Sequence, residues 1–372
     1  MRLGVNTVRL TRPFTGVGRY IECVLDEWSR MDHPFDEIVL YTHSPLDPAR
    51  VVFPLDAYRV EVVGHEAPDP LWEWRTLPRL AGDIDVLFCP SYTVPIGYPG
   101  KCAVGYLGPS ENVPLSKEWW RSLAYNQLHK YSARHADYVF ACSKIVKRRV
   151  VDVFGVPEER VGVTFLAPSD LFQPIDDARL LEAMRRKYAG ADTPYILFVG
   201  KLAKRHYIPN LLKAFARLVE KHDPPHKLMI VGPDYLGLDI PARARRLGIS
   251  EKVVYHPFIT HQDLPPVYNA ADIFIFPASE VEGFGLPPIE AMACGTPTIT
   301  TNQGSLREFA PGAALLTETP SADDLEAALG ELIFNAELKE ELRQKGIQRA
   351  SEITWRVTAE KTMDVLWDLA NR

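Results

Sequence analysis

Short apolar runs rich in β-branched residues alternate along this chain with segments in which apolar residues recur every three or four positions. The runs predict strands at 2–7, 37–41, 59–63, 85–89, 102–107, 138–142 and 161–165, and again at 195–199, 227–231, 253–255, 273–276 and 296–300. The helical spacing is clearest at 207–221 and 264–271. Almost continuously apolar strands that alternate with helices are typical of parallel sheets covered on both faces. Two such series in one chain predict two doubly wound α/β domains.

The length of 372 residues also favours two domains. A polar, proline-containing stretch at 167–194 has a short helical pattern at 178–188 and no strand pattern, so we place the boundary there. We expect an N-terminal domain at 1–175 and a C-terminal domain at 190–354. A last helix at 357–370 follows a break at Thr354 and Trp355.

The composition is that of an ordinary globular protein, with 46% hydrophobic and 24% charged residues. A net charge of −6 argues against a nucleic-acid binder with a dominant basic face. The five cysteines are scattered without a C-x-x-C pair, which is typical of thiols in a reducing compartment and not of a zinc site. We see no signal peptide and no apolar run near the ~20 residues that span a bilayer, and therefore predict a cytoplasmic protein.

The segment 271–297 carries the clearest chemistry. It reads as a buried strand, a glycine-bearing turn, a helix whose first turn holds Pro287 and Pro288, and a helix stop at Gly295. A short turn from a strand into a helix presents free amides and the positive end of the helix dipole. The sequence therefore predicts an anion site that suits phosphate.

Two carboxylates flank this predicted anion site. Glu282 lies at the strand exit and Glu290 lies about one turn into the helix, eight positions later. Carboxylates accept hydrogen bonds from vicinal hydroxyls, at ~1.5–3 kcal/mol each. A site in which backbone amides bind phosphate and carboxylates bind sugar hydroxyls suits a nucleotide sugar. In the alternative interpretation, Glu290 only complements the helix dipole and Glu282 is a solvated loop residue.

Residues 282–297 read EGFGLPPIEAMACGTP, which closely resembles the E-x7-E signature of family 4 retaining glycosyltransferases, including mannosyltransferases. Further matching segments follow in the same order as in that family: GVGRY at 16–20, ADYVFACSK at 136–144, VGKL at 199–202, VGP at 231–233 and NQGSLRE at 302–308. The resemblance covers nearly the whole chain. It implies the GT-B fold, in which two Rossmann-like domains face each other across a cleft and the last helix, here 355–372, packs back on the first domain.

The resemblance also implies roles for particular residues. Glu290 would bind the ribose of the nucleotide and Glu282 the hydroxyls of the transferred sugar. The nucleobase would be held by backbone near 257–259, and Gly16 would leave room for phosphate or acceptor, unless it only makes a tight turn. The full set of expected donor-binding residues is Gly16, Gly18, Gly200, Lys201, Arg205, Phe258, Glu282, Gly283, Phe284, Gly285, Leu286 and Glu290.

A departing nucleoside diphosphate needs positive charge or dipoles beside it. Asp83 and Asp85 have the D-x-D spelling of metal-dependent transferases, but they precede a strand, so we predict no metal and no other cofactor. Lys201 occupies the position of the first basic residue of the family. The second, usually Lys, falls at His206, and Lys204 and Arg205 just before it are possible substitutes. Because histidine is charged only near its unperturbed pKa of ~6.5, a role for His206 would add pH sensitivity.

The chain departs from the family pattern where many members carry a histidine after a first-domain strand. The closest match here is Leu107, followed by the polar residues Ser110, Glu111 and Asn112. Retention by same-face attack does not require the histidine, because the leaving phosphate can accept the proton of the acceptor. Glu111 is a candidate base. The candidate catalytic residues are thus Lys201, His206, Glu282 and Glu111.

Several aromatic residues of the first domain suit sugar or lipid contacts, although packing is the interpretation that we favour. They are Trp72, Trp74, Tyr92, Trp119 and Trp120. Likewise Lys117, Arg121 and Lys130 suit either a peripheral membrane contact or a solvated helix face, and we favour the latter because acidic residues dilute the charge.

The sequence thus predicts a metal-independent retaining glycosyltransferase. It would transfer a hexose from GDP-mannose or a UDP-sugar to a glycan or lipid-linked glycan, in the context of bacterial surface polysaccharide synthesis. The missing histidine keeps a non-catalytic nucleotide-sugar-binding subunit as an alternative. A sugar-nucleotide epimerase of the same fold is a second alternative.

Overall fold

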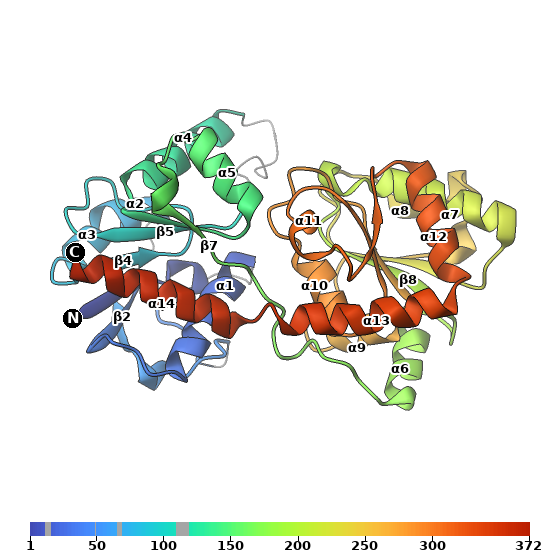
Figure 1. Cartoon of the computed structure of the whole chain (residues 1–372), viewed down its shortest axis with the longest axis horizontal. Coiled ribbons are helices and arrows are strands. Elements are labelled where there is room, and N and C mark those ends of the chain that lie inside the picture. The colour runs from blue at the N-terminus through green and yellow to red at the C-terminus, as the bar shows by residue number, and fades with distance from the viewer. Residues whose placement is uncertain (12–15, 49, 65–68, 109–118) are drawn as a thin grey trace. The chain divides into compact units, whose positions relative to one another are not determined.

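The computed structural model describes residues 1–11, 16–48, 50–64, 69–108 and 119–372. The chain forms two compact units (Figure 1). The first contains Met1–Leu166 and Trp355–Arg372, and the second contains Ala167–Thr354. The N-terminal segment of the first unit ends at Leu166, before the predicted domain end at 175. The stretch left between the predicted domains lies in the second unit as α6 (Ala178–Met184) and a π-helical turn (Arg185–Ala189).

The first unit is built on a seven-stranded sheet in the order β3-β2-β1-β4-β5-β6-β7, in which every pairing is parallel. Its strands are β1 (Arg2–Asn6), β2 (Glu37–Thr42), β3 (Arg59–Val62), β4 (Val86–Cys89), β5 (Cys102–Tyr106), β6 (Tyr138–Ala141) and β7 (Val161–Val163). The central strands β4 and β5 are buried along their whole length. Burial on both faces explains why they read as continuous apolar runs.

Most of these strands are connected through helices, as is usual for parallel pairing, and a last helix packs on the same unit. They are α1 (Gly16–Ser29), α2 (Asp69–Arg75), α3 (Leu77–Leu80), α4 (Trp119–His135), α5 (Lys144–Asp152) and the last helix α14 (Trp355–Asn371). Helix α14 packs against α1, and the indole Nε1 of Trp28 donates to the carbonyl of Ala359 at 3.0 Å. Trp367 also meets Phe35 edge to face, with ring centroids 5.3 Å apart. The C-terminal segment is therefore part of the core of the first unit.

The second unit has a six-stranded sheet in the order β10-β9-β8-β11-β12-β13, again with parallel pairings throughout. Its strands are β8 (Tyr195–Val199), β9 (Lys227–Val231), β10 (Val253–His256), β11 (Ile273–Phe276), β12 (Thr298–Thr301) and β13 (Leu315–Thr317). Besides α6, its helices are α7 (Ile208–His222), α8 (Ile240–Arg246), α9 (Leu264–Ala270), α10 (Leu286–Ala293), α11 (Leu306–Phe309), α12 (Ala322–Ile333) and α13 (Ala336–Ser351).

Two parallel-sheet α/β units confirm the predicted fold class. The predicted strands fall on observed ones, with ends that differ by one or two residues. Strand β13 was not predicted, because it is a three-residue strand at the sheet edge, two of whose residues are half-exposed. Such a strand leaves no long apolar run in the sequence.

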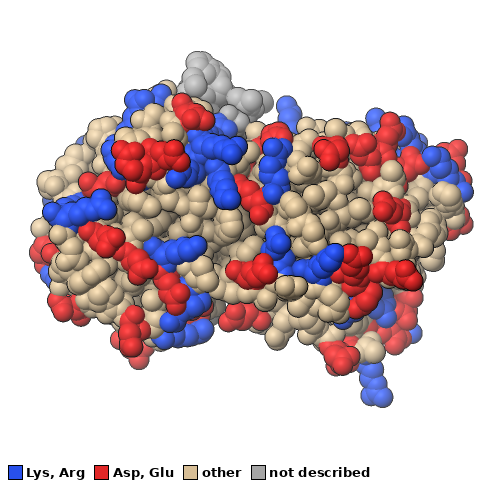
Figure 2. All heavy atoms as spheres, viewed as in Figure 1, with Lys and Arg blue, Asp and Glu red and all other residues tan. Residues whose placement is uncertain are grey.

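The surface carries charges of both signs. On the face shown in Figure 2, Lys and Arg side chains are interspersed with Asp and Glu side chains on both units. Within the described part of the chain, no helix combines the length and the apolar character that a membrane span requires.

Candidate functional site

The order of strands in the second unit marks one edge of its sheet as the place for a ligand. The chain runs from β8 outward through β9 to β10, then returns to the other side of β8 as β11. The loops that leave the carboxyl ends of β8 and β11 therefore diverge, and ligands of open α/β sheets bind at such switch points. Lys201 and His206 follow β8, and Glu282 follows β11. The fold thus brings three of the four predicted catalytic residues to one edge.

The carboxylate of Glu282 is held by two neighbouring basic side chains. Its Oε2 atom lies 2.9 Å from Nε of Arg205 and 3.1 Å from Nε2 of His206. All three side chains are largely buried, with exposed fractions of 12%, 18% and 3% for Glu282, Arg205 and His206. Within the described part of the chain, the second carboxylate oxygen, Oε1, accepts no hydrogen bond. Glu282 is therefore anchored through one oxygen and offers the other.

Electrostatics favour the ionised form of Glu282. Burial raises the pKa of this carboxyl, but the hydrogen bond and charge of His206, together with those of Arg205, outweigh burial. The net effect is that the pKa of Glu282 lies below its ordinary value of 4.5. Glu282 is accordingly a carboxylate near neutral pH.

Both ring nitrogens of His206 face hydrogen-bond acceptors. Nδ1 lies 2.6 Å from the carbonyl oxygen of Lys201, and Nε2 faces Glu282. A neutral imidazole carries one N–H and cannot donate to both, so both bonds form only when the ring is doubly protonated. The ring also packs against Phe198 and Phe276, with centroids 5.8 and 4.8 Å away. These contacts fix the orientation of the ring.

Lys201 is exposed, and within the described residues its ammonium group forms no ion pair. Its Nζ atom lies over the ring of Tyr235, 5.8 Å from the centroid. Lys204 is also exposed, at the start of the 3₁₀ turn η6 (Lys204–His206). Since Arg205 forms an ion pair with Glu282, the exposed ammonium group of Lys201 supplies positive charge at this edge.

The turn into α10 has the predicted form of an anion site. Gly285 precedes the helix with a left-handed φ of +89°, and a Cβ there would lie 2.7 Å from a methyl carbon of Leu306. Among the described residues, no group accepts a hydrogen bond from the amides of Gly285 and Leu286, as is usual at a helix N-terminus. Phe284 points its ring inward onto Phe309, with centroids 5.3 Å apart, so its side chain belongs to the core. Gly295, which follows the helix, is left-handed as predicted.

Glu290 is more enclosed than the sequence suggests. Its side chain is only 3% exposed, and the hydroxyl of Tyr268 donates to its Oε2 atom at 3.1 Å. Tyr268 was not predicted as a site residue, because its place in α9 carries only the helical apolar spacing. Its contact with Glu290 depends on the packing of α9 beside α10. The ribose-binding role of Glu290 stays a prediction.

Other predicted donor-binding residues lie at the same edge or in the first unit. Gly200 directly follows β8 and packs against Gly232, where a Cβ would approach the Gly200 carbonyl oxygen to 2.0 Å. Gly283 is buried in the turn, and Phe258, after β10, is 74% exposed. In the first unit, Gly16 is exposed at the start of α1, and Gly18 is buried in the first turn of the same helix.

The first unit has a corresponding switch point between β1 and β4. There the buried carboxylate of Glu73 accepts hydrogen bonds from the side chains of Asn6, at 3.2 Å, and Thr93, at 2.7 Å. Neither the charge pattern nor a motif indicated this buried cluster. Leu107 directly follows β5, and the candidate base Glu111 lies outside the described residues.

The aromatic residues of the first unit have mostly structural surroundings. Trp72 is buried and donates from Nε1 to the carbonyl of Val63 at 2.5 Å. Tyr92 stacks on the ring of His129, with centroids 5.0 Å apart, and has an unusual positive φ of 66°. Burial lowers the pKa of His129 to about 4. The packing interpretation fits Trp72 and Tyr92.

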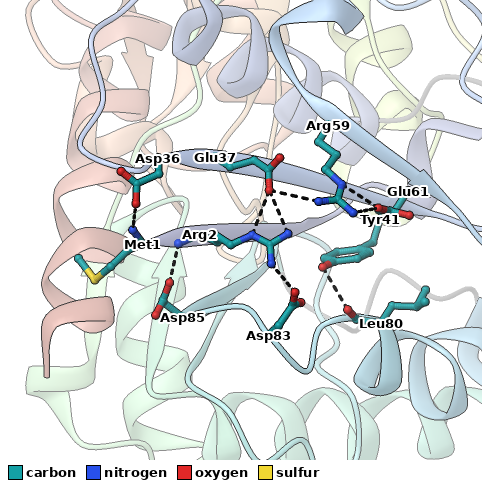
Figure 3. Close-up of polar contacts among 10 residues, drawn as sticks. All are labelled: Met1, Arg2, Asp36, Glu37, Tyr41, Arg59, Glu61, Leu80, Asp83 and Asp85. Atoms are coloured by element: carbon teal, nitrogen blue, oxygen red, sulfur yellow. Dashed lines mark hydrogen bonds and ion pairs between the residues drawn. The ribbon is translucent and has the colours of Figure 1, made fainter.

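The D-x-D residues lie at the amino edge of the first sheet, beside the start of β1 (Figure 3). Asp83 forms an ion pair with the guanidinium of Arg2, and Asp85 accepts a hydrogen bond from the backbone amide of Arg2 at 2.5 Å. The Arg2 guanidinium also bonds Glu37 at 3.0 Å. Both aspartates thus serve to hold strands together at the edge opposite the strand carboxyl ends. Throughout the described ranges, no three His, Cys, Asp or Glu side chains gather as a metal site would require.

Comparison with known proteins agrees with this geometry. Residues 182–349 match the family described as glycosyl transferases group 1. The second unit is a group 1 glycosyltransferase domain. The matched range includes β8, β11 and α10, and thus the whole Glu282 site.

Two relatives illustrate what the chain is similar to. O-antigen chain mannosyltransferase B of Escherichia coli is 28% identical over 238 residues, which are 64% of this chain and 62% of the relative. A D-inositol 3-phosphate glycosyltransferase of Nocardia farcinica is 31% identical over 252 residues, 63% of this chain and 54% of the relative. The chain therefore matches less than two thirds of the length of these relatives.

A solved structure extends the comparison to both units. The Anabaena protein Alr3699/HepE, crystallised with UDP and glucose, superposes with a TM-score of 0.78 at 14% identity, over 99% of this chain and 100% of that one. The fold of the chain is thus GT-B, as the sequence resemblance implied. The E-x7-E assignment, the family 4 subclass and the retaining stereochemistry stay predictions.

Proposed function

We propose that this chain is a retaining glycosyltransferase that moves a hexose from a nucleotide sugar to a hydroxyl of a glycan or lipid-linked glycan. The observation that carries the proposal is the joining of Lys201, His206 and Glu282 at the switch point of a group 1 domain. A cationic edge beside a helix N-terminus suits a diphosphate, and a carboxylate with one unengaged oxygen suits sugar hydroxyls.

The donor is a nucleoside diphosphate hexose, either GDP-mannose or a UDP-sugar. Mannose transfer is supported by the name of the Escherichia coli relative, and a UDP-sugar by the UDP and glucose bound to the structural neighbour. The polysaccharide context is supported by the name of the same relative, an O-antigen chain mannosyltransferase. We place the reaction in the cytoplasm, with the acceptor reached at the inner face of a membrane.

In this proposal the cations stabilise the leaving group. As the bond from the anomeric carbon to the β-phosphate breaks, charge grows on the phosphate oxygen. Lys201, doubly protonated His206 and the amides of Gly285 and Leu286 face that charge. Their preorganised charge takes the place of a metal ion, so the reaction needs none.

Glu282 positions the hexose through Oε1 while Arg205 and His206 hold Oε2. The acceptor oxygen attacks the anomeric carbon on the face that the diphosphate leaves, and the acceptor proton passes to the departing phosphate oxygen. One carbon–oxygen bond forms as another breaks, and the configuration is retained. No protein base is required, which fits the leucine at position 107.

An NMR assay tests this function. The purified chain is incubated with GDP-mannose or UDP-glucose, with and without glycan acceptors and with a metal chelator, and the anomeric protons are followed. Transfer with retention that persists in chelator supports the proposal. Inversion, a metal requirement, or conversion of donor alone to an epimer would contradict it. Donor binding without any turnover would identify the non-catalytic subunit instead.

A further inference from the structure

Tyr235 is a large aromatic residue left exposed at the ligand-binding edge of the second unit. Its exposed fraction is 61%. The strand register pairs Val199 of β8 with Val231 of β9, and Val231 with His256 of β10. Val199, Val231 and His256 thus lie side by side. Lys201 lies two residues after Val199, Phe258 lies two after His256, and Tyr235 lies four after Val231, so all three follow neighbouring strands at the same edge of the sheet. Exposed rings that gather at one sheet edge indicate a binding surface.

The turn that carries Tyr235 is braced on both sides. The side chain of Asp234 accepts hydrogen bonds from the amides of Leu236, at 3.0 Å, and Asp239, at 3.2 Å. The amide of Leu202 donates to the carbonyl of Pro233 at 2.9 Å, which ties this turn to the loop after β8. The exposed ring therefore stands on a fixed backbone and does not owe its exposure to a loose loop.

Lys201 contacts this ring, but the contact is weak enough to be exchanged. A cation over an exposed aromatic ring is held less strongly than a cation that forms a charge-assisted hydrogen bond. A diphosphate at the edge will therefore draw the ammonium of Lys201 away from Tyr235. The ring face that Lys201 leaves is then open to another flat group.

We propose that Tyr235 is the stacking platform for the nucleobase of the donor. This rests on the proposed function, because it takes the ligand to be a nucleoside diphosphate sugar. With the diphosphate at Lys201 and the α10 N-terminus, the base is the flat apolar part of the ligand that remains to be covered. Stacking tolerates any base, so Tyr235 contributes affinity for guanine and uracil alike.

Calorimetric titration of the full chain tests the platform. The probes are GDP, UDP and two base-free anions, pyrophosphate and ribose 5-phosphate. Tyr235→Ala is expected to weaken GDP and UDP binding by about 5- to 150-fold, the range for loss of one aromatic stack, while the base-free probes bind unchanged. Tyr235→Phe should restore the affinity. Phe334→Ala, which removes an equally exposed ring (61%) at the end of α12, should change nothing.

Three outcomes would overturn the assignment. Unchanged GDP and UDP affinity in Tyr235→Ala would exclude the platform. A loss of affinity in Phe258→Ala alone would instead assign base stacking to Phe258, after β10. An equal loss for ribose 5-phosphate would mean that the ring contacts sugar or phosphate. If the wild-type chain binds neither GDP nor UDP, the proposed function itself fails, which the wild-type titration reveals on its own.

Discussion

The Nε2 atom of His206 lies 3.1 Å from the Oε2 atom of Glu282, while its Nδ1 atom lies 2.6 Å from the carbonyl oxygen of Lys201. One imidazole thus links the loop after β8 to the loop after β11. It requires two protons to do so.

Glu282→Gln separates sugar binding from diphosphate binding. The variant removes the negative charge beside Arg205 and His206 but keeps the shape of the side chain. We expect transfer to slow by about 10- to 150-fold, equivalent to a lost charge-assisted hydrogen bond. Affinity for the bare nucleoside diphosphate should stay equal or rise, because the edge becomes more positive. Steady-state kinetics and calorimetry with the product nucleotide measure the two effects, and a parallel loss of both would contradict this division of roles.

Glu22 in α1 predicts a pH-dependent stability. Burial raises the pKa of this carboxyl from 4.5 to about 7, although Arg19 acts in the opposite direction. Between these values the native state keeps a proton that the unfolded state has lost, so the free energy of unfolding falls as the pH rises.

Glu22→Gln should therefore gain stability relative to wild type from about pH 4.5 to pH 7, by up to about 3 kcal/mol, and level off above. Denaturant unfolding across this range measures the gain. Glu159→Gln, at an exposed position of the same unit, should show no such trend. A pH-independent difference for Glu22→Gln would show that the carboxyl is not titrating as described.

Gly304→Ala tests the close packing around the Glu282 loop. Gly304 has a φ of +56°, and a Cβ would lie 2.9 Å from the carbonyl oxygen of Ser279 and 3.2 Å from that of Glu282. Gly312 has a φ of +78° with open space around it, so Gly312→Ala measures backbone strain alone, at about 1–2 kcal/mol. We expect both variants to lower the melting temperature, and only Gly304→Ala to lower transfer as well. If Gly304→Ala and Gly312→Ala transfer at the same rate, the Glu282 loop accommodates the added methyl group without moving the site.

Much of the fold was predictable because buried parallel strands leave continuous apolar runs, as β8 and β11 show. Strand β13 was not, since it is short and half-exposed. Individual site residues were predictable from the sequence, namely Glu282 and the basic residues that precede α7. Their pairing was not, because the contact between His206 and Glu282 joins residues 76 positions apart. Tyr268 and Tyr235 were missed for the same reason: their importance comes from neighbours that only the folded chain supplies.

The central claim is that the β8–β11 edge binds the diphosphate of a nucleotide sugar through Lys201. Calorimetric titration of GDP-mannose and UDP-glucose into wild type, Lys201→Ala and Lys345→Ala tests it most directly. Lys345 is the control, because it carries the same charge as Lys201 but lies on α13, where it forms an ion pair with Glu341 of the same helix. The account predicts that Lys345→Ala binds a donor as wild type does and that Lys201→Ala binds it at least about tenfold more weakly. Equal affinity in all three proteins would contradict it.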